Sequence, residues 1–118
     1  MNAKRLLKVA ELAARIPSND LDMNLWGCGT PQCIMGHATQ DPYFRKQGLR
    51  AEKEHHGPEY SPWYKQEFGF AAIQKFFGID QKEAESLFLG EKYRNCCSGK
   101  ECARKIRKFV EKRQKVKV

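Results

Sequence analysis

The chain has 118 residues, of which 41% are hydrophobic and 31% are charged. This length suits one domain with a single modest core, and no apolar run is long enough to span a bilayer. The formal net charge of +8 is unevenly placed, since 11 basic residues balance 11 acidic ones up to Gly90, whereas 11 basic residues meet only 3 acidic ones after it. The basic C-terminal segment favours contact with phosphate, acidic protein or anionic membrane, without specifying which.

The N-terminus lacks the apolar centre and cleavage site of a signal peptide, so we expect a cytoplasmic protein. The chain has five cysteines, an odd number. Without a secretory signal, they are better interpreted as thiols, packed or bound to metal, than as a disulfide framework.

The first predicted helix spans residues 2–16, where apolar side chains recur at the three-and-four spacing of a single buried stripe. Pro17 ends it. A second, short helix is predicted over residues 31–39, because Thr30 can cap it and Pro31 suits its first position. This pattern places Cys33 in the first turn of the helix and His37 on the same face one turn later.

Three interpretations of this cysteine and histidine stretch stay open. A structural zinc ion would take Cys28, Cys33 and His37, with a fourth ligand among His55, His56, Cys96, Cys97 and Cys102. A cysteine-dependent hydrolase or transferase would use an exposed Cys33 thiolate, with His37 or the His55 and His56 pair as base. We favour a third interpretation, in which Cys33 is a small buried residue and the protein needs neither metal nor cofactor.

Residues 43–66 are predicted to form a long irregular loop, because the run from His55 to Pro58 breaks helical patterning. Tyr60, Trp63 and Tyr64 then supply aromatic side chains. A long loop in a small domain is often functional, so these aromatic residues are candidates for partner binding, although coverage of the core edge is the more common role of such residues.

Two further helices are predicted over residues 67–77 and 81–89, with Gly78 as a C-cap and Asp80 with Glu83 as a capping box. Their spacing permits a helix-turn-helix, but Glu83 and Glu85 would then face phosphate.

The last predicted helix spans residues 98–111 and starts with a second capping box, formed by Ser98 and Glu101. Residues 112–118 have nothing to bury, and we expect a frayed basic tail after a single domain spanning 1–111. Seven cations of this region are candidates for contact with a partner: Lys100, Arg104, Lys105, Arg107, Lys108, Lys112 and Arg113.

Several segments also carry a resemblance. These are residues 21–26, the run C-G-T-P-Q-C-I-M-G-H-A over residues 28–38, and F-G-I-D, E-A and L-F between residues 77 and 88. They resemble a group of small uncharacterised bacterial and phage proteins with the pattern C-G-T-x-x-C-[IL]-x-G-[HW]-A. The resemblance implies a compact helical module and no particular activity. Trp often replaces His at the position of His37, which argues against an obligatory metal ligand there.

Together these patterns predict an all-α bundle of four to five helices with a long irregular loop. The predicted function is non-enzymatic binding of a protein or nucleic acid, as an accessory protein of the bacterial or phage type. The aromatic loop and the basic C-terminal helix are expected to form the contacts. A zinc-dependent nucleic-acid-binding module and a cysteine-dependent enzyme remain the alternatives.

Overall fold

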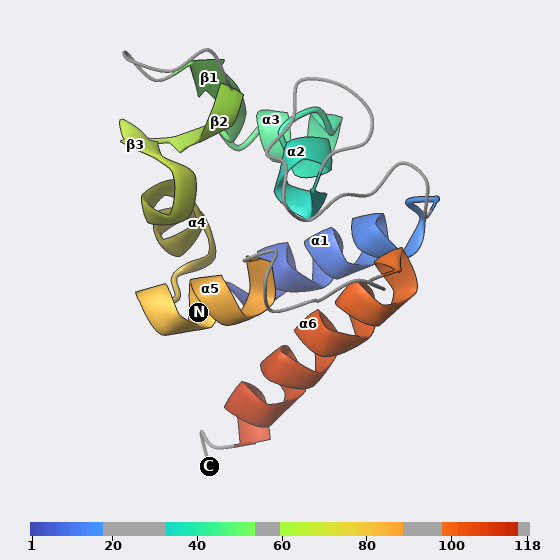
Figure 1. The fold of residues 1–118 in the computed structure, drawn as a ribbon. Helices are drawn as coiled ribbons and strands as arrows, with labels where there is room; N and C mark the ends of the chain where they lie inside the picture. Colours follow the sequence, from blue (N-terminus) through green and yellow to red (C-terminus); the bar gives the residue numbers. More distant parts are fainter. Residues whose placement is uncertain (18–32, 54–59, 89–97, 116–118) are drawn as a thin grey trace.

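The computed structural model describes residues 1–17, 33–53, 60–88 and 98–115. Within these ranges it contains six helices and one small three-stranded antiparallel sheet (Figure 1). The prediction of a mostly helical protein is confirmed. The prediction of a purely all-α fold is wrong, because the middle of the chain pairs into strands. The Cα radius of gyration of 13.3 Å is that of one compact globule.

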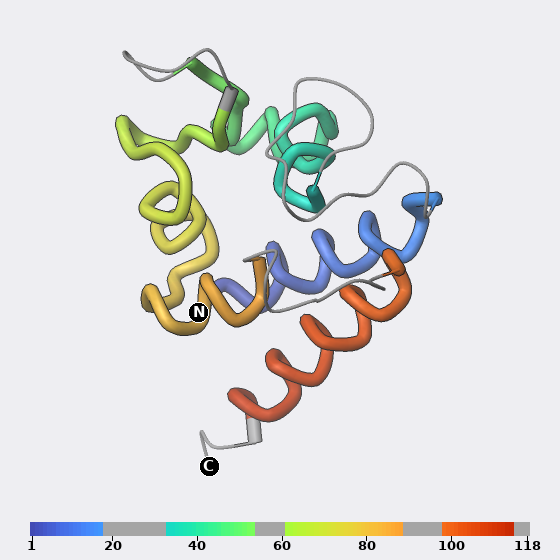
Figure 2. The backbone as a smooth tube through the Cα atoms, viewed as in Figure 1, coloured from blue at the N-terminus to red at the C-terminus, as the bar shows by residue number. Residues whose placement is uncertain are grey.

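Helix α1 (Ala3–Ala14) is the central element, since three other helices pack against it: α2 (Ile34–Ala38), α4 (Gly69–Phe77) and α6 (Gly99–Lys115). Figure 2 shows α1 running between α2 and α6. Its start is held by Asn2, whose side chain accepts a hydrogen bond from the Arg5 amide at 3.0 Å. The Asn2 amide in turn donates to the Phe77 carbonyl at 2.6 Å. The predicted apolar stripe is buried, with Leu6, Val9, Ala10 and Ala13 as its members.

Helix α6 (Gly99–Lys115) packs along α1 through a stripe of small and branched side chains. At Gly99 the two backbones come so close that a Cβ atom would lie 2.0 Å from the Ala13 carbonyl oxygen. Only glycine fits at this crossing without displacing one of the helices. The buried residues of α6 are Cys102, Ala103, Ile106 and Val110.

Helix α6 continues past its predicted end at residue 111 and reaches Lys115. The predicted capping box is present in part, since the Glu101 amide donates to Ser98 Oγ at 3.2 Å. Near the other end, Arg113 forms an ion pair with Glu83, and its guanidinium lies 5.7 Å from the centre of the Phe109 ring. These contacts give the last turns of α6 a partner that the sequence pattern did not reveal.

Helix α2 (Ile34–Ala38) is shorter than predicted. Cys33 is its N-cap rather than a residue of its first turn, and its Sγ accepts a hydrogen bond from the Gly36 amide at 3.4 Å. The predicted cap at Thr30 and Pro31 lies outside the described residues. The next helix is α3 (Pro42–Arg45), which Asp41 caps by accepting from the Tyr43 amide at 2.9 Å.

The sheet replaces much of the predicted irregular loop. Its strands are β1 (Arg50–Lys53), β2 (Tyr60–Tyr64) and β3 (Glu67–Phe68). They pair in this order, with Trp63 opposite both Arg50 and Phe68. Lys65 and Gln66 form the turn between the last two strands, with φ angles of 46° and 73°, and this handedness matches the twist of a hairpin. The helix predicted from residue 67 therefore starts two residues later.

Helices α4 (Gly69–Phe77) and α5 (Gln81–Phe88) form the predicted corner. Gly78 ends α4 in the left-handed conformation, with φ 65° and ψ 44°. The capping box is confirmed: the Glu83 amide donates to Asp80 Oδ1 at 2.8 Å, and the Asp80 amide donates to Glu83 Oε1 at 3.0 Å.

Aromatic rings connect the sheet to the helices. The rings of Tyr64 and Phe76 meet edge to face with centroids 4.9 Å apart, and Phe77 stacks on Phe88 at 5.3 Å. Phe44 joins the same cluster through Phe76. Such ring pairs add to the free energy of burial. The aromatic cluster therefore anchors α3, α4, α5 and β2 to one core.

Candidate nucleic-acid interface

The outer side of α6 carries a line of cations. Its inner side is buried against α1, so the residues that remain exposed follow the helical spacing of three and four. Lys100, Arg104 and Lys108 are four residues apart, and Arg107 lies beside them one turn from Arg104. All four side chains are exposed. Packing of α6 on α1 thus fixes the direction in which these charges point.

These cations line a groove between α6 and the end of α1. The groove encloses about 520 Å³ and is called the basic groove below. Ala14 supplies its α1 side, where a small side chain leaves space beside the helix. Its described lining residues are Ala14, Lys100, Arg104, Arg107, Lys108 and Glu111.

Among the described side chains, no ion pair neutralises a cation of the basic groove. The ion pairs in which both side chains are described join Lys8 to Glu11 and Arg113 to Glu83, so neither involves a cation of the groove. Glu111 is the one carboxylate among the described lining residues, at the C-terminal end of the stripe. Four positive charges therefore face solvent from one rigid surface.

The other predicted cations of this helix do not line the groove. Lys105 and Lys112 lie on a different side of α6, about 100° around the helix axis from the middle of the stripe. Arg113 is held by Glu83 and Phe109. The structure thus brings together four of the seven cations that the sequence indicated.

The aromatic candidates lie elsewhere. Tyr64 is 6% exposed and belongs to the core, while Trp63 is half-buried with the Arg50 guanidinium 6.0 Å from its ring centre. The backbone of Tyr60 is part of β2, and its side chain lies outside the described residues. Figure 1 shows the sheet at the opposite end of the molecule from α6. The predicted aromatic and basic surfaces are therefore two separate regions.

Tyr64 lies beside a half-buried cation, Arg5, that sequence analysis did not single out. Arg5 Nε donates to Gln47 Oε1 at 2.7 Å, Arg5 Nη1 donates to the Phe76 carbonyl at 2.8 Å, and the guanidinium lies 4.1 Å from the centre of the Phe76 ring. Burial alone would raise the pKa of Tyr64. The hydrogen bond and charge of Arg5, together with Lys65, outweigh burial and lower this pKa below its ordinary value of 10.0.

Some of the cysteine and histidine candidates lie in the described part of the chain and others do not. Cys33 is 1% exposed, which does not meet the need of a catalytic cysteine for an accessible thiol, and His37 is half-buried in the last turn of α2. Cys102 is buried and takes part in a disulfide bond, contrary to the expectation of thiols or metal ligands. Among the described residues no three potential ligands come together for a metal ion. The other proposed ligands lie outside them, namely Cys28, His55, His56, Cys96 and Cys97.

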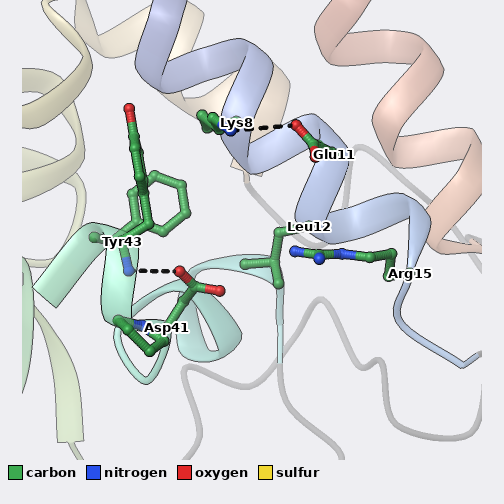
Figure 3. Close-up of a pocket in the computed structure, with 8 residues that line it drawn as sticks. Lys8, Glu11, Leu12, Arg15, Asp41 and Tyr43 are labelled. Atoms are coloured by element: carbon green, nitrogen blue, oxygen red, sulfur yellow. Dashed lines mark hydrogen bonds and ion pairs between the residues drawn. The ribbon is translucent and has the colours of Figure 1, made fainter.

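A second, smaller hollow of about 260 Å³ lies between α1 and α3 (Figure 3). Lys8 pairs with Glu11 at 3.7 Å and lies 5.4 Å from the centre of the Tyr43 ring. The Arg15 side chain extends toward Leu12. Two cations and two carboxylates line this hollow, so its charge favours neither sign: Lys8, Arg15, Glu11 and Asp41.

Comparison with family models, with curated protein sequences and with solved structures found no match for this chain. The resemblance to small bacterial and phage proteins stays a prediction. None of the helices in the described ranges combines the length and the apolar composition that a membrane span requires.

Two residues of the groove were not among the sequence candidates. Glu111 follows Arg107 by four residues and Arg104 by seven, so helical spacing could have placed it on the same stripe. Ala14 could not have been found in this way, because its role depends on how α1 crosses α6.

Proposed function

We propose that this protein binds nucleic acid without catalysing a reaction, through the basic groove of α6. The observation that carries the proposal is the set of four exposed cations on one rigid helix face, with no ion pair to neutralise them among the described residues. Lysine and arginine clusters of this kind bind phosphate backbones by releasing counterions from them.

The placement of these charges costs folding free energy. Neighbouring cations at helical spacing repel one another. Lys100 also lies in the first turn of α6, where the helix dipole favours anions. Folding alone does not need this cluster, because the inner side of α6 supplies the buried contacts. A polyanionic ligand would remove the repulsion, which supports a binding role.

The described lining of the groove has no aromatic side chain, and this favours nucleic acid over an acidic protein as the partner. Protein interfaces are anchored by tryptophan and tyrosine as well as arginine. None of the described residues that line the groove is aromatic, and Trp63 lies with the sheet at the other end of the molecule. A ligand held chiefly by charge fits this surface better.

The test compares two double variants of the full chain with equal net charge. Lys100→Gln with Lys108→Gln removes two groove lysines, whereas Lys46→Gln with Lys82→Gln removes two exposed lysines on other elements. Binding to labelled mixed-sequence DNA, as a duplex and as single strands, is followed by fluorescence anisotropy across a salt series. We expect the groove variant to reduce the slope of log affinity against log salt by about 2, while the control stays near wild type.

Equal losses in the two variants would show that net charge rather than the groove controls binding, and would contradict the proposal. So would an absence of salt-dependent binding by the wild-type protein. Point substitutions are preferable to deletion of α6, because deletion would expose the apolar face of α1. The free energy of unfolding of each variant should lie within about 0.5 kcal/mol of the wild-type value, since surface substitutions of this kind are nearly neutral.

A further inference from the structure

We infer that the basic groove binds the sugar–phosphate backbone of a double-stranded nucleic acid in preference to a single strand. This inference rests on the proposed function and names the ligand class of the same site. It follows from the spacing of the cations, from the stiffness of the helix that carries them and from the side chains that line the groove.

The cations form a line of fixed length. Lys100 and Lys108 are eight residues apart, which corresponds to about 12 Å along a helix axis. The major groove of a DNA duplex is also about 12 Å wide. The two ends of the line can therefore reach phosphates on both sides of that groove, while Arg104 and Arg107 lie between them.

The line is also stiff. Ala103 and Ile106, which alternate with the cations along α6, are fully buried, and Gly99 lies against the backbone of α1. Because the helix is fixed, its cations project from regular positions and complement phosphates that are already held at regular positions, as they are in a duplex. A flexible single strand would lose conformational freedom to match the same row, which weakens its binding.

Single-strand binding usually depends on aromatic side chains that stack on the bases. The described lining of the basic groove provides cations, one carboxylate and Ala14. Phe109, the aromatic residue of α6, does not line the groove, is half-buried and has the Arg113 guanidinium over its ring. The described lining of the groove therefore suits contact with phosphates and offers no aromatic side chain to stack on a base.

A substitution of Glu111 tests the inference, because it should raise the affinity for the duplex. Its carboxylate lies at the end of the cation line, where a phosphate of the bound backbone would meet repulsion. Glu111→Gln removes this charge with little change in shape. It should tighten duplex binding by about threefold at low salt, and by less as salt is raised.

The main experiment uses the full chain with one labelled DNA duplex, its two separated strands and a duplex of shuffled sequence. We expect the duplex to bind about tenfold tighter than either strand, with a salt slope near −3.6 for four phosphate contacts. The shuffled duplex should bind within about threefold of the first, because phosphates carry no sequence information.

Single strands that bind as tightly as the duplex would overturn this inference and leave the proposed function standing. A preference of more than about tenfold between the two duplexes would overturn it as well, since base contacts would then be required. Failure of all the probes to bind would instead contradict the proposed function itself.

Discussion

Arg5 and Arg104 are both helical arginines with very different surroundings. Arg5 donates to Gln47 and to the Phe76 carbonyl and lies over two aromatic rings. Arg104 is exposed on α6 among other cations and belongs to no ion pair within the described ranges. The contacts of Arg5 hold the fold together, whereas the cations of α6 stay exposed to solvent. Their neighbours in space, rather than residue type, make this difference.

The largest effect on stability is expected at Arg5. Arg5→Met removes the donors to Gln47 and Phe76 and the charge over two rings, so the free energy of unfolding should fall by about 2–4 kcal/mol. Arg104→Met is the matched control and should change it by no more than about 0.5 kcal/mol. Chemical denaturation of both variants makes the measurement. Similar losses of stability in the two variants would contradict the different structural roles given to Arg5 and Arg104.

A smaller loss of stability is expected from a substitution on the inner side of α6. Gly99→Ala places a methyl group 2.0 Å from the Ala13 carbonyl oxygen, so the helices must separate, at a cost of about 1–3 kcal/mol. Lys100→Ala, one residue along on the outer side, should be close to neutral. Thermal unfolding of both variants tests this contrast between the two sides of one helix. A Gly99→Ala protein as stable as wild type would mean that the crossing is looser than described.

The smallest effect concerns pH. Because the pKa of folded Tyr64 lies below its ordinary value of 10.0, the folded state binds fewer protons than the unfolded state between those two values. Stability should therefore increase slightly as pH rises through the folded pKa, and this contribution is lost as pH falls again. Ultraviolet titration should show an early phenolate signal that Tyr64→Phe removes.

Lys65→Gln supplies the matched variant for this titration, since it takes away one of the two cations while Arg5 keeps its contacts. It should move the early phenolate signal toward higher pH, because Lys65 lowers the pKa of Tyr64. An unchanged titration would show that Arg5 alone outweighs the burial of this side chain.

Local signals in the sequence predicted most of the helices. Gly78 as a C-cap and the Asp80 with Glu83 capping box depend on atoms at most four residues apart, so their patterns are legible without a fold. The apolar stripe of α1 and the cation spacing on α6 are local in the same sense. The sequence by itself therefore determined where these helices lie and which of their sides is charged.

Tertiary structure alone decided the rest. Strand β1 shows no alternation of apolar and polar residues, and its pairing with β2 joins residues as far apart as Arg50 and Trp63. The burial of Tyr64, the need for glycine at residue 99 and the role of Ala14 in the groove all depend on elements distant in the chain. The physical reason is that caps and stripes depend on spacings of three or four residues along one helix, whereas pairing, close crossing and charge compensation require neighbours that only the folded chain brings together.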